Sequence, residues 1–434
     1  RSRRERVIIV RMSTLRRKFN IMVRDRDLRN SILFTLGALI VFRFLASIPV
    51  PGVNPAVLTQ FLQNNEFFSF LNLFSGGGLS QLSIIVLGVG PYITSSIIMQ
   101  LMTTVSPKLK QLFHEEGSIG RRKFNMYSRL LTVPIAIIQG FGILTLLSRQ
   151  GALPELGLGG MIMNVLVVTA GAMLITWIGE LISEFGIGNG VSLIIFAGIV
   201  ASLPQVLSQL VQSYIPSELF NYVLYGIVVL VVIVSVVLVN EAERRVGITY
   251  AKQVRGMSTY GGADTYVPMK LNQAGVMPII FALSILLFPQ MIANYFLTSA
   301  TPWLAQAAAS VNFVLQHNIW YPVLYFILVF GFTYFYTAIT FDPEAMSENL
   351  QKSGAFVPGT RPGQSTSDYF AKVASRLTFV GATFLGVIAV LPIVLLSTTG
   401  NSAVAIGGTG ILIVVSVVLD LIKKVDAQIA MRQY

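Results

Sequence analysis

The chain has 434 residues and a net charge of +12; 54% of its residues are hydrophobic, 12% are charged and none is cysteine. Because an ordinary soluble protein carries about 25% charged residues, this composition excludes one. The lack of cysteine excludes disulfides, zinc–thiolate sites and thiol catalysis. The composition therefore predicts a membrane protein.

Ten apolar segments follow one another along the chain, and each approaches the ~20 residues that a helix needs to cross a bilayer. Helices are the expected spanning element, because backbone polar groups must be paired internally in lipid. We therefore predict an all-α polytopic membrane protein with ten transmembrane helices. The expected spans are 31–48, 84–103, 130–147, 161–182, 190–211, 220–239, 274–296, 319–341, 378–397 and 403–422.

Lys and Arg residues are sorted to one side of these spans. If the N-terminus is cytosolic, 29 of the 31 lie in cytosolic segments or at their edges, and Arg43 and Arg149 are the exceptions. Such asymmetry sets orientation, so both ends are expected in the cytosol. Orientation and contact with anionic lipids explain most of the charge, and an RNA-containing partner such as a ribosome is a second use of the same loops.

The N-terminus and segment 66–83 need separate interpretations. A basic start followed by an apolar run imitates a secretory signal, but nine further spans favour an uncleaved first span; Met12 is a candidate natural start.

Segment 66–83 is apolar but is interrupted by Gly76, Gly77 and Gly78, and glycine runs loosen helices. We interpret it as a re-entrant or plugging element against the second span, with an external amphipathic loop as the alternative.

Two long cytosolic loops are expected, at about 241–273 and 342–377. The second contains the sequence GAFVPGTRPG, which is rich in turn-forming residues. Long ordered loops often bind partners, so both are candidate binding surfaces. Flexible connectors are the alternative, because Gly and Pro are also common in linkers.

Short motifs recur in the two halves of the chain. The pattern G-V-x-P-x-I occurs at 88–93 and again at 275–280, and Ile187-Gly188 near the fifth span matches Ile406-Gly407 near the tenth. Five spans per half is an odd number, so the halves are expected to have opposite topology. Inverted repeats place the functional site at the midplane between the halves.

Motifs for hydrolytic chemistry are missing from the sequence. There is no H-E-x-x-H, Walker A, G-x-S-G or G-x-G-D motif, and His114 and His317 are both expected in loops. The ionisable residues Glu180, Asp420 and Arg43 lie toward the ends of their spans, where a structural or interfacial role is expected. We therefore predict neither an enzyme nor a cofactor site, and any energy source must lie in a partner.

Branched apolar side chains occupy the repeated elements instead. They could form a constriction that excludes water and ions by dewetting, and ordinary helix packing is the alternative for each of them. The residues are Val89, Ile93, Val191, Ile195, Ile280 and Ile413.

Several long motifs together resemble the SecY family, the channel subunits of Sec protein translocases, over residues 25–434. They are PVPGVN (49–54), NLFSGGGLS (72–80), GPYITSSIIMQ (90–100), EEGSIGRRK (115–123), GIGNGVSLIIFAGIVA (186–201), RRVGITYAK (244–252), KLNQAGVMPIIFA (270–282), YTAITFDPEAMSENLQKSGAFVPGTRPG (336–363), RLTFVGA (376–382) and GGTGILIVV (407–415).

The resemblance implies two inverted five-helix halves around a central pore. It places the family's pore ring on the six apolar residues named above and its plug at about 67–82. The plug residues are Asn72, Phe74, Ser75, Gly76, Gly77, Gly78 and Leu79. It also implies a lateral gate between spans 2–3 and 7–8, with Gln100 and Asn272 in a polar cluster at its cytosolic side.

The resemblance further implies partners: the SecE and SecG subunits, the ATPase SecA, the ribosome and precursor proteins that carry signal sequences. Contacts with SecA or the ribosome are expected at Arg244, Arg245, Lys270 and Arg361. Thr360 departs from the isoleucine that the family usually has before this last arginine.

The expected function is a protein-conducting channel that moves unfolded secretory proteins across a membrane and releases transmembrane segments sideways into lipid. A bacterial plasma membrane is the expected location and a thylakoid membrane the alternative. A secondary transporter of a small solute, or a scaffold or insertase without a through pore, are the alternative functions. The expected divisions are a basic segment (1–30), a first half (31–211), span 6 with its loop (212–273), the remainder of the second half (274–422) and a tail (423–434).

Overall fold

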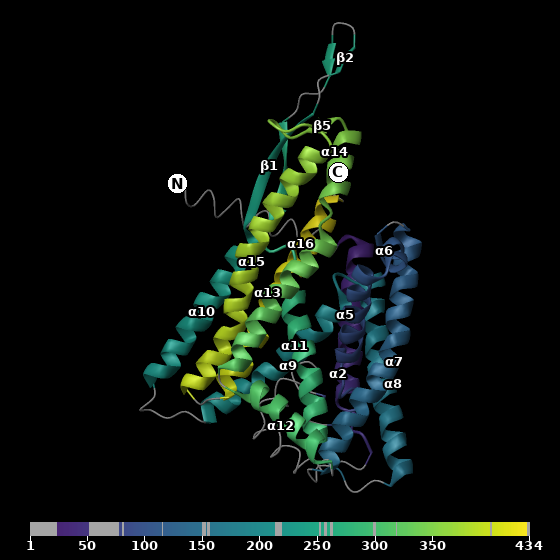
Figure 1. Ribbon diagram of the computed structural model, residues 1–434, viewed down its shortest axis with the longest axis vertical. Coiled ribbons are helices and arrows are strands. Elements are labelled where there is room, and N and C mark those ends of the chain that lie inside the picture. Colours follow the sequence, from purple (N-terminus) through teal and green to yellow (C-terminus); the bar gives the residue numbers. More distant parts are fainter. Residues whose placement is uncertain are drawn as a thin grey trace. The chain divides into compact units, whose positions relative to one another are not determined.

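The computed structural model describes residues 24–51, 78–79, 82–114, 116–149, 153, 157–212, 219–250, 253–255, 258–260, 264–297, 301–317, 319–399 and 402–431 (Figure 1). The described chain is mostly helical, with two small sheets. It forms two compact units. The first comprises Arg1–Ser213, Met291–Ala309 and Val417–Tyr434, and the second comprises Tyr214–Gln290 and Ser310–Ser416.

Six helices lie wholly within the first unit. They are α2 (Arg26–Ala46), α5 (Gly90–Val105), α6 (Pro107–His114), α7 (Gly117–Arg149), α8 (Leu158–Phe185) and α9 (Gly190–Gln212). Helix α5 packs on α7, α7 packs on α8, and α8 packs on α9, while α2 contacts both α8 and α9. Helices α5, α7 and α8 therefore form a continuous packed series.

The second unit contains α10 (Leu219–Glu241), α13 (Trp320–Thr340), α14 (Pro343–Lys352) and α15 (Gln364–Thr399). Three helices contribute residues to both units: α11 (Met277–Phe296), α12 (Pro302–Gln316) and α16 (Ser402–Met431). Helix α13 packs along α15, and Val236, Ile388 and Leu412 join α10, α15 and α16 in a buried apolar cluster.

Side chains cap several helix starts. The Asp25 carboxylate accepts hydrogen bonds from Asp27 N (3.0 Å) and Leu28 N (3.4 Å) before α2. The Asn189 side-chain oxygen similarly accepts from the main-chain N–H groups of Val191 and Ser192 before α9. Each cap satisfies main-chain donors that the helix itself leaves unpaired, so these short polar residues fix where the helices begin.

Each predicted span overlaps a helix, but the boundaries differ. Five described helical stretches are long and apolar enough to cross a membrane: α2, α7, α8, the stretch Trp320–Lys352 and α15. Residues 84–89 were expected in the second span and form turns instead. Helices α7 and α15 begin 13 and 14 residues before their predicted spans, and His114, expected in a loop, ends α6. Hydropathy shows only which residues prefer lipid. A helix can continue outside the lipid wherever its main-chain hydrogen bonds are still made, so the helices extend beyond the predicted spans.

The two long loops contain strands. Strand β1 (Glu243–Tyr250) pairs antiparallel with β4 (Asp264–Lys270) on one side and with β5 (Ala355–Phe356) on the other. A smaller pair, β2 (Gln253–Arg255) and β3 (Ser258–Tyr260), lies between β1 and β4 in the chain. Val246 and Ile248 alternate with exposed residues along β1, so one face of the strand is buried.

One apolar core joins these strands to the start of α15. The side chains that form it come from both loops and from the helix: Val246, Ile248, Met269, Ala355, Val357, Phe370, Val373 and Ala374. We call strands β1, β4 and β5 with this core the sheet module. Because both loops contribute to one core, the expectation that they are ordered surfaces holds for the described residues.

Candidate functional site

A buried segment without helical structure leads into α5. Val50 N donates to Leu82 O (2.7 Å) and Ile84 N donates to Ile48 O (3.0 Å), which makes an antiparallel bridge between Pro49 and Ser83. These bonds pair main-chain groups that burial would otherwise leave unsatisfied. Non-helical backbone is tolerated at membrane depth where protein buries it, and this segment meets that condition.

Helix α8 packs directly against this segment, because Gly171 of α8 has no side chain there. A Cβ atom at Gly171 would lie 2.0 Å from the main-chain oxygen of Ile84, so only glycine allows α8 to pack here. Leu79 and Leu82 are fully buried in the same core as Val86 and Val168. Leu82 also has a φ of 42°, which is uncommon for a residue with a side chain.

The described part of the predicted plug is therefore its C-terminal end. The Gly78 carbonyl accepts a hydrogen bond from Ser83 N (2.7 Å), and Leu79 is buried. Asn72, Phe74, Ser75, Gly76 and Gly77 lie outside the described residues. The assignment of these residues to a plug remains a prediction.

The first repeated motif has the same local structure in both places. Gly88 has a φ of 53° and Gly275 a φ of 63°, values that favour glycine. In each case a helix begins two residues later and has proline, Pro91 or Pro278, as its second residue. Proline suits the first turn because the N–H groups there lack intrahelical partners.

The second repeated motif differs between its two copies. Gly188 has a φ of 96° in the turn before α9, whereas Gly407 lies inside α16. The predicted tenth span, 403–422, already placed Ile406-Gly407 inside the helix, and α16 agrees with that prediction. Helix α16 begins at Ser402, so the repeated dipeptide precedes one helix and lies within the other.

Four of the six predicted ring residues belong to the first unit. Val89 directly precedes α5 and is fully buried, and Ile93 lies one turn later, with its N–H bonded to the Val89 carbonyl. Val191 and Ile195 lie in the first two turns of α9. Ile195 is buried, while Val191 is partly buried and would lie 3.4 Å from a Cβ atom at Gly179 on α8.

The other two ring residues belong to the second unit. Ile280 lies in the first turn of α11 and Ile413 lies in the middle of α16, and both are buried. All six side chains are thus shielded to a degree that suits either a seal or helix packing. The closure of a ring between the two units remains a prediction.

The predicted gate residue Asn272 is anchored within its own unit. Its Nδ2 donates to Asn240 Oδ1 (2.9 Å) and Gly275 O (3.2 Å), and its Oδ1 accepts from Gly275 N (3.0 Å). Asn240 Nδ2 in turn donates to Ser416 Oγ (3.2 Å) on α16. Sequence reasoning missed Asn240 and Ser416, although a lone asparagine after the apolar run of α10 was a signal for a polar contact.

Gln100, the gate residue expected in the first unit, bonds within α5. Its Nε2 donates to Ser96 Oγ (3.3 Å). Its Oε1 is buried, and no partner for it occurs among the described residues. A polar cluster shared by Gln100 and Asn272 remains a prediction.

Three of the four predicted contact arginines and lysines lie at one end of the β1–β4 pair. Register places Glu243 opposite Lys270 and Arg245 opposite Pro268. The Arg245 guanidinium lies 4.7 Å from the centre of the Tyr266 ring, and its Nε is 3.2 Å from Glu243 Oε1. Arg244 and Lys270 are exposed. The sheet module therefore collects basic side chains on a rigid support.

Arg361 is presented by a tight, internally bonded loop after β5. Its side chain is exposed, while its main-chain carbonyl accepts a hydrogen bond from Thr366 Oγ1 (2.9 Å). Thr360 Oγ1 donates to Val357 O (3.0 Å), and Ser347 Oγ of α14 donates to Gly363 O (2.7 Å). Thr360, where the family usually has isoleucine, thus adds a bond that stiffens the loop.

Long apolar helices, a buried non-helical segment and a basic sheet module define a polytopic helical membrane protein. The chain belongs to the SecY family, whose model matches residues 83–422. It is 41% identical to the protein translocase subunit SecY of Halalkalibacterium halodurans, over 96% of this chain and 98% of that protein. It is 39% identical to the protein translocase subunit SecY of Streptomyces coelicolor, over 94% of this chain and 96% of that protein.

Solved structures share the fold at lower sequence identity. A structure of a protein-conducting channel matches with a TM-score of 0.63 and 18% identity, over 94% of each chain. Sec61 in the canine ribosome–channel complex of the endoplasmic reticulum matches with a TM-score of 0.62 and 18% identity, again over 94% of each chain. The predicted all-α membrane fold of this family is confirmed, and its bacterial relatives make this a bacterial membrane protein.

Proposed function

We propose that this chain is the channel subunit of a bacterial protein translocase and conducts unfolded proteins through the membrane. The observation that carries this proposal is 41% identity over nearly the whole chain to a protein translocase subunit. The match in fold to a protein-conducting channel supports it. The buried turns at 82–89 support it as well, because irregular backbone at depth is typical of transport sites.

In this proposal the apolar ring seals the channel and the plug blocks it at rest. A signal segment enters at the lateral gate, the plug moves, and branched side chains close around the translocating chain without demanding specific hydrogen bonds. A hydrophobic segment then leaves sideways, because transfer of apolar surface into lipid is favourable. The channel catalyses no reaction, and energy comes from SecA or from chain elongation on a ribosome.

Partners are proposed from charge and from the structural relatives. One relative is a ribosome–channel complex, and the sheet module of this chain offers exposed cations to phosphate-rich RNA or to an acidic protein surface. SecA and the ribosome are proposed to contact Arg244, Arg245, Lys270 and Arg361. SecE and SecG are proposed to contact the membrane-embedded surface. Both termini are placed in the cytosol of a bacterial plasma membrane; a thylakoid membrane is the alternative.

Arg361→Glu tests the proposed role of the sheet module. We expect SecA-driven translocation of a secretory precursor into proteoliposomes to fall roughly tenfold, because a charge-assisted contact contributes about 1.5 kcal/mol or more. SecA binding in detergent is expected to change less than transport. Lys352→Glu is the matched control, since Lys352 is the last residue of α14, in the same predicted loop between spans, and is paired with Glu348 at 3.0 Å. Normal transport by the Arg361 variant would remove its assigned role.

A further inference from the structure

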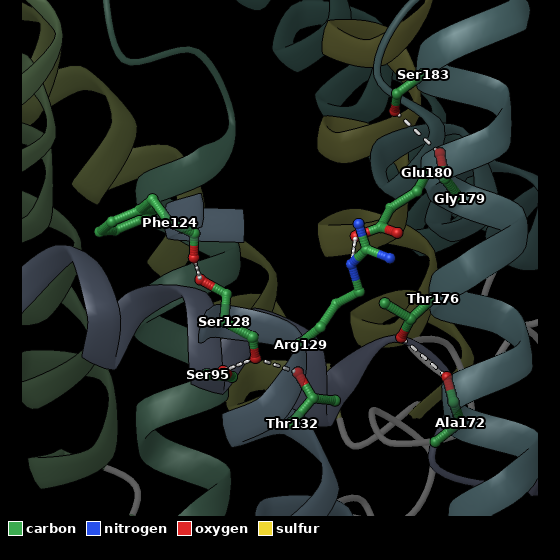
Figure 2. Close-up of polar contacts among 10 residues, drawn as sticks. All are labelled: Ser95, Phe124, Ser128, Arg129, Thr132, Ala172, Thr176, Gly179, Glu180 and Ser183. Atoms are coloured by element: carbon green, nitrogen blue, oxygen red, sulfur yellow. Dashed lines mark hydrogen bonds and ion pairs between the residues drawn. The ribbon is translucent and has the colours of Figure 1, made fainter. Parts of the chain in front are cut away.

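A polar ladder ties three helices of the first unit together. Ser95 Oγ on α5 donates to the main-chain carbonyl of Ser128 on α7 (2.5 Å), and Thr132 Oγ1 donates to the same carbonyl (2.8 Å). The next residue, Arg129, places its Nε 2.9 Å from Glu180 Oε1 on α8. Figure 2 shows Arg129 reaching from α7 toward Glu180 beside these bonds. Adjacent positions of α7 thus hold α5 and α8.

Burial makes this ladder specific. Ser95 is fully buried and Ser128 nearly so; in the ion pair, the Glu180 side chain is 22% exposed and the Arg129 side chain 47% exposed. Glu180 is the more buried partner, so removal of Arg129 leaves its carboxylate without a counter-charge, whereas solvent reaches the half-exposed Arg129 guanidinium.

The place of Arg129 in α7 indicates what these contacts do. Arg129 stands where α7 changes from its polar first turns to the apolar run that begins at Leu130. Helices α5 and α7 correspond to the second and third spans, which are gate helices of the proposed channel. Helix α8 corresponds to the fourth span and packs on α7. An ion pair at this point resists movement of α7 away from α8, and the Ser95 bond makes α5 follow α7.

We propose that Arg129 and Glu180 are positioning residues for the gate: they hold α7, and through Ser95 also α5, against α8 until a sufficiently hydrophobic signal segment arrives. This inference rests on the proposed channel function and deepens it. Neither residue touches the translocating chain. Their effect is to set how hydrophobic a signal must be before the gate yields.

The test compares two precursors in proteoliposomes that contain the full translocase with SecA and ATP. One precursor has an intact signal sequence and the other has a shortened apolar region. Arg129→Gln and Glu180→Gln are each expected to raise transport of the second precursor relative to the first about fivefold, the size of a ~1 kcal/mol coupling in a partly exposed ion pair. The exchange of Arg129→Glu with Glu180→Arg is expected to restore the wild-type ratio in part.

Asp420→Asn is the matched control. Asp420 pairs with Lys424 at 3.1 Å within α16, so this change removes an ion pair that joins no two helices. Its transport ratio is expected to equal that of the wild type. An unchanged ratio in both Arg129 and Glu180 variants, or a parallel loss of both precursors, would overturn the inference, since the latter means only structural damage. Failure of the wild-type protein to transport the intact precursor would instead refute the proposed function.

Discussion

Ile195→Asp is expected to raise the ion conductance of membranes that contain the resting channel by at least about tenfold. Ile195 is buried in the first two turns of α9, at a position assigned to the apolar ring. A carboxylate holds water, whereas a hydrophobic constriction excludes ions because it dewets. An aspartate at mid-membrane costs about 2.5–3.5 kcal/mol, so the surrounding side chains are expected to admit water to it. Conductance across a planar bilayer, or dye release from vesicles, measures the effect.

Two control variants separate a seal from ordinary packing. Ile195→Leu keeps the volume and apolar character, and volume-conserving changes of this kind are tolerated, so conductance is expected to stay low. Ile199→Asp changes a buried residue one turn further along the same helix, outside the predicted ring. Equal leak from the Ile195 and Ile199 aspartate variants would mean that the position has no special role.

Gly171→Val is expected to prevent stable assembly of the first unit. A Cβ atom there would lie 2.0 Å from the main-chain oxygen of Ile84, and a backbone segment held by bonds to Ile48 and Val50 cannot move aside easily. The expected loss is at least about 3 kcal/mol, at the upper end for overpacking. Thermal unfolding in detergent, followed by size-exclusion chromatography, measures it.

Gly37→Val provides the comparison for that loss. Gly37 lies inside α2, and no other group comes within 4 Å of the place where its Cβ would be. Its replacement is expected to leave the melting temperature nearly unchanged. If the Gly171 and Gly37 variants unfold at the same temperature, the close contact between α8 and residue 84 is not a determinant of stability.

Helix positions were predictable because they depend on local composition. The apolar runs that predicted α8 and α9 give nearly the observed bounds. Residues 84–89 defeated the same reasoning, since they are as apolar as a helix but form turns that are closed by local main-chain bonds, and the stretch is anchored at its start by the long-range bonds of Leu82 to Val50 and of Ile84 to Ile48. Such pairing joins distant parts of the chain, and no local pattern encodes it.

Polar positions of the site show the same division. Arg361 and Asn272 could be predicted as site residues because they lie in recognisable motifs. The residues that hydrogen-bond to them and hold them in place could not be predicted. Asn272 depends on Asn240, which is 32 residues away, and Arg129 depends on Glu180 on another helix. The strands of the sheet module were also missed, because short strands such as β5 are set by pairing with β1 rather than by their own sequence.

Disulfide crosslinking tests the path of the translocating chain most directly, because the protein has no cysteine of its own. One cysteine replaces Ile195 and a second is placed in a precursor stalled during transport into proteoliposomes with SecA and ATP. The predicted result is a crosslink that requires both ATP and a signal sequence, which puts the precursor through the apolar ring. Transport of the precursor without any crosslink at this position would contradict that path.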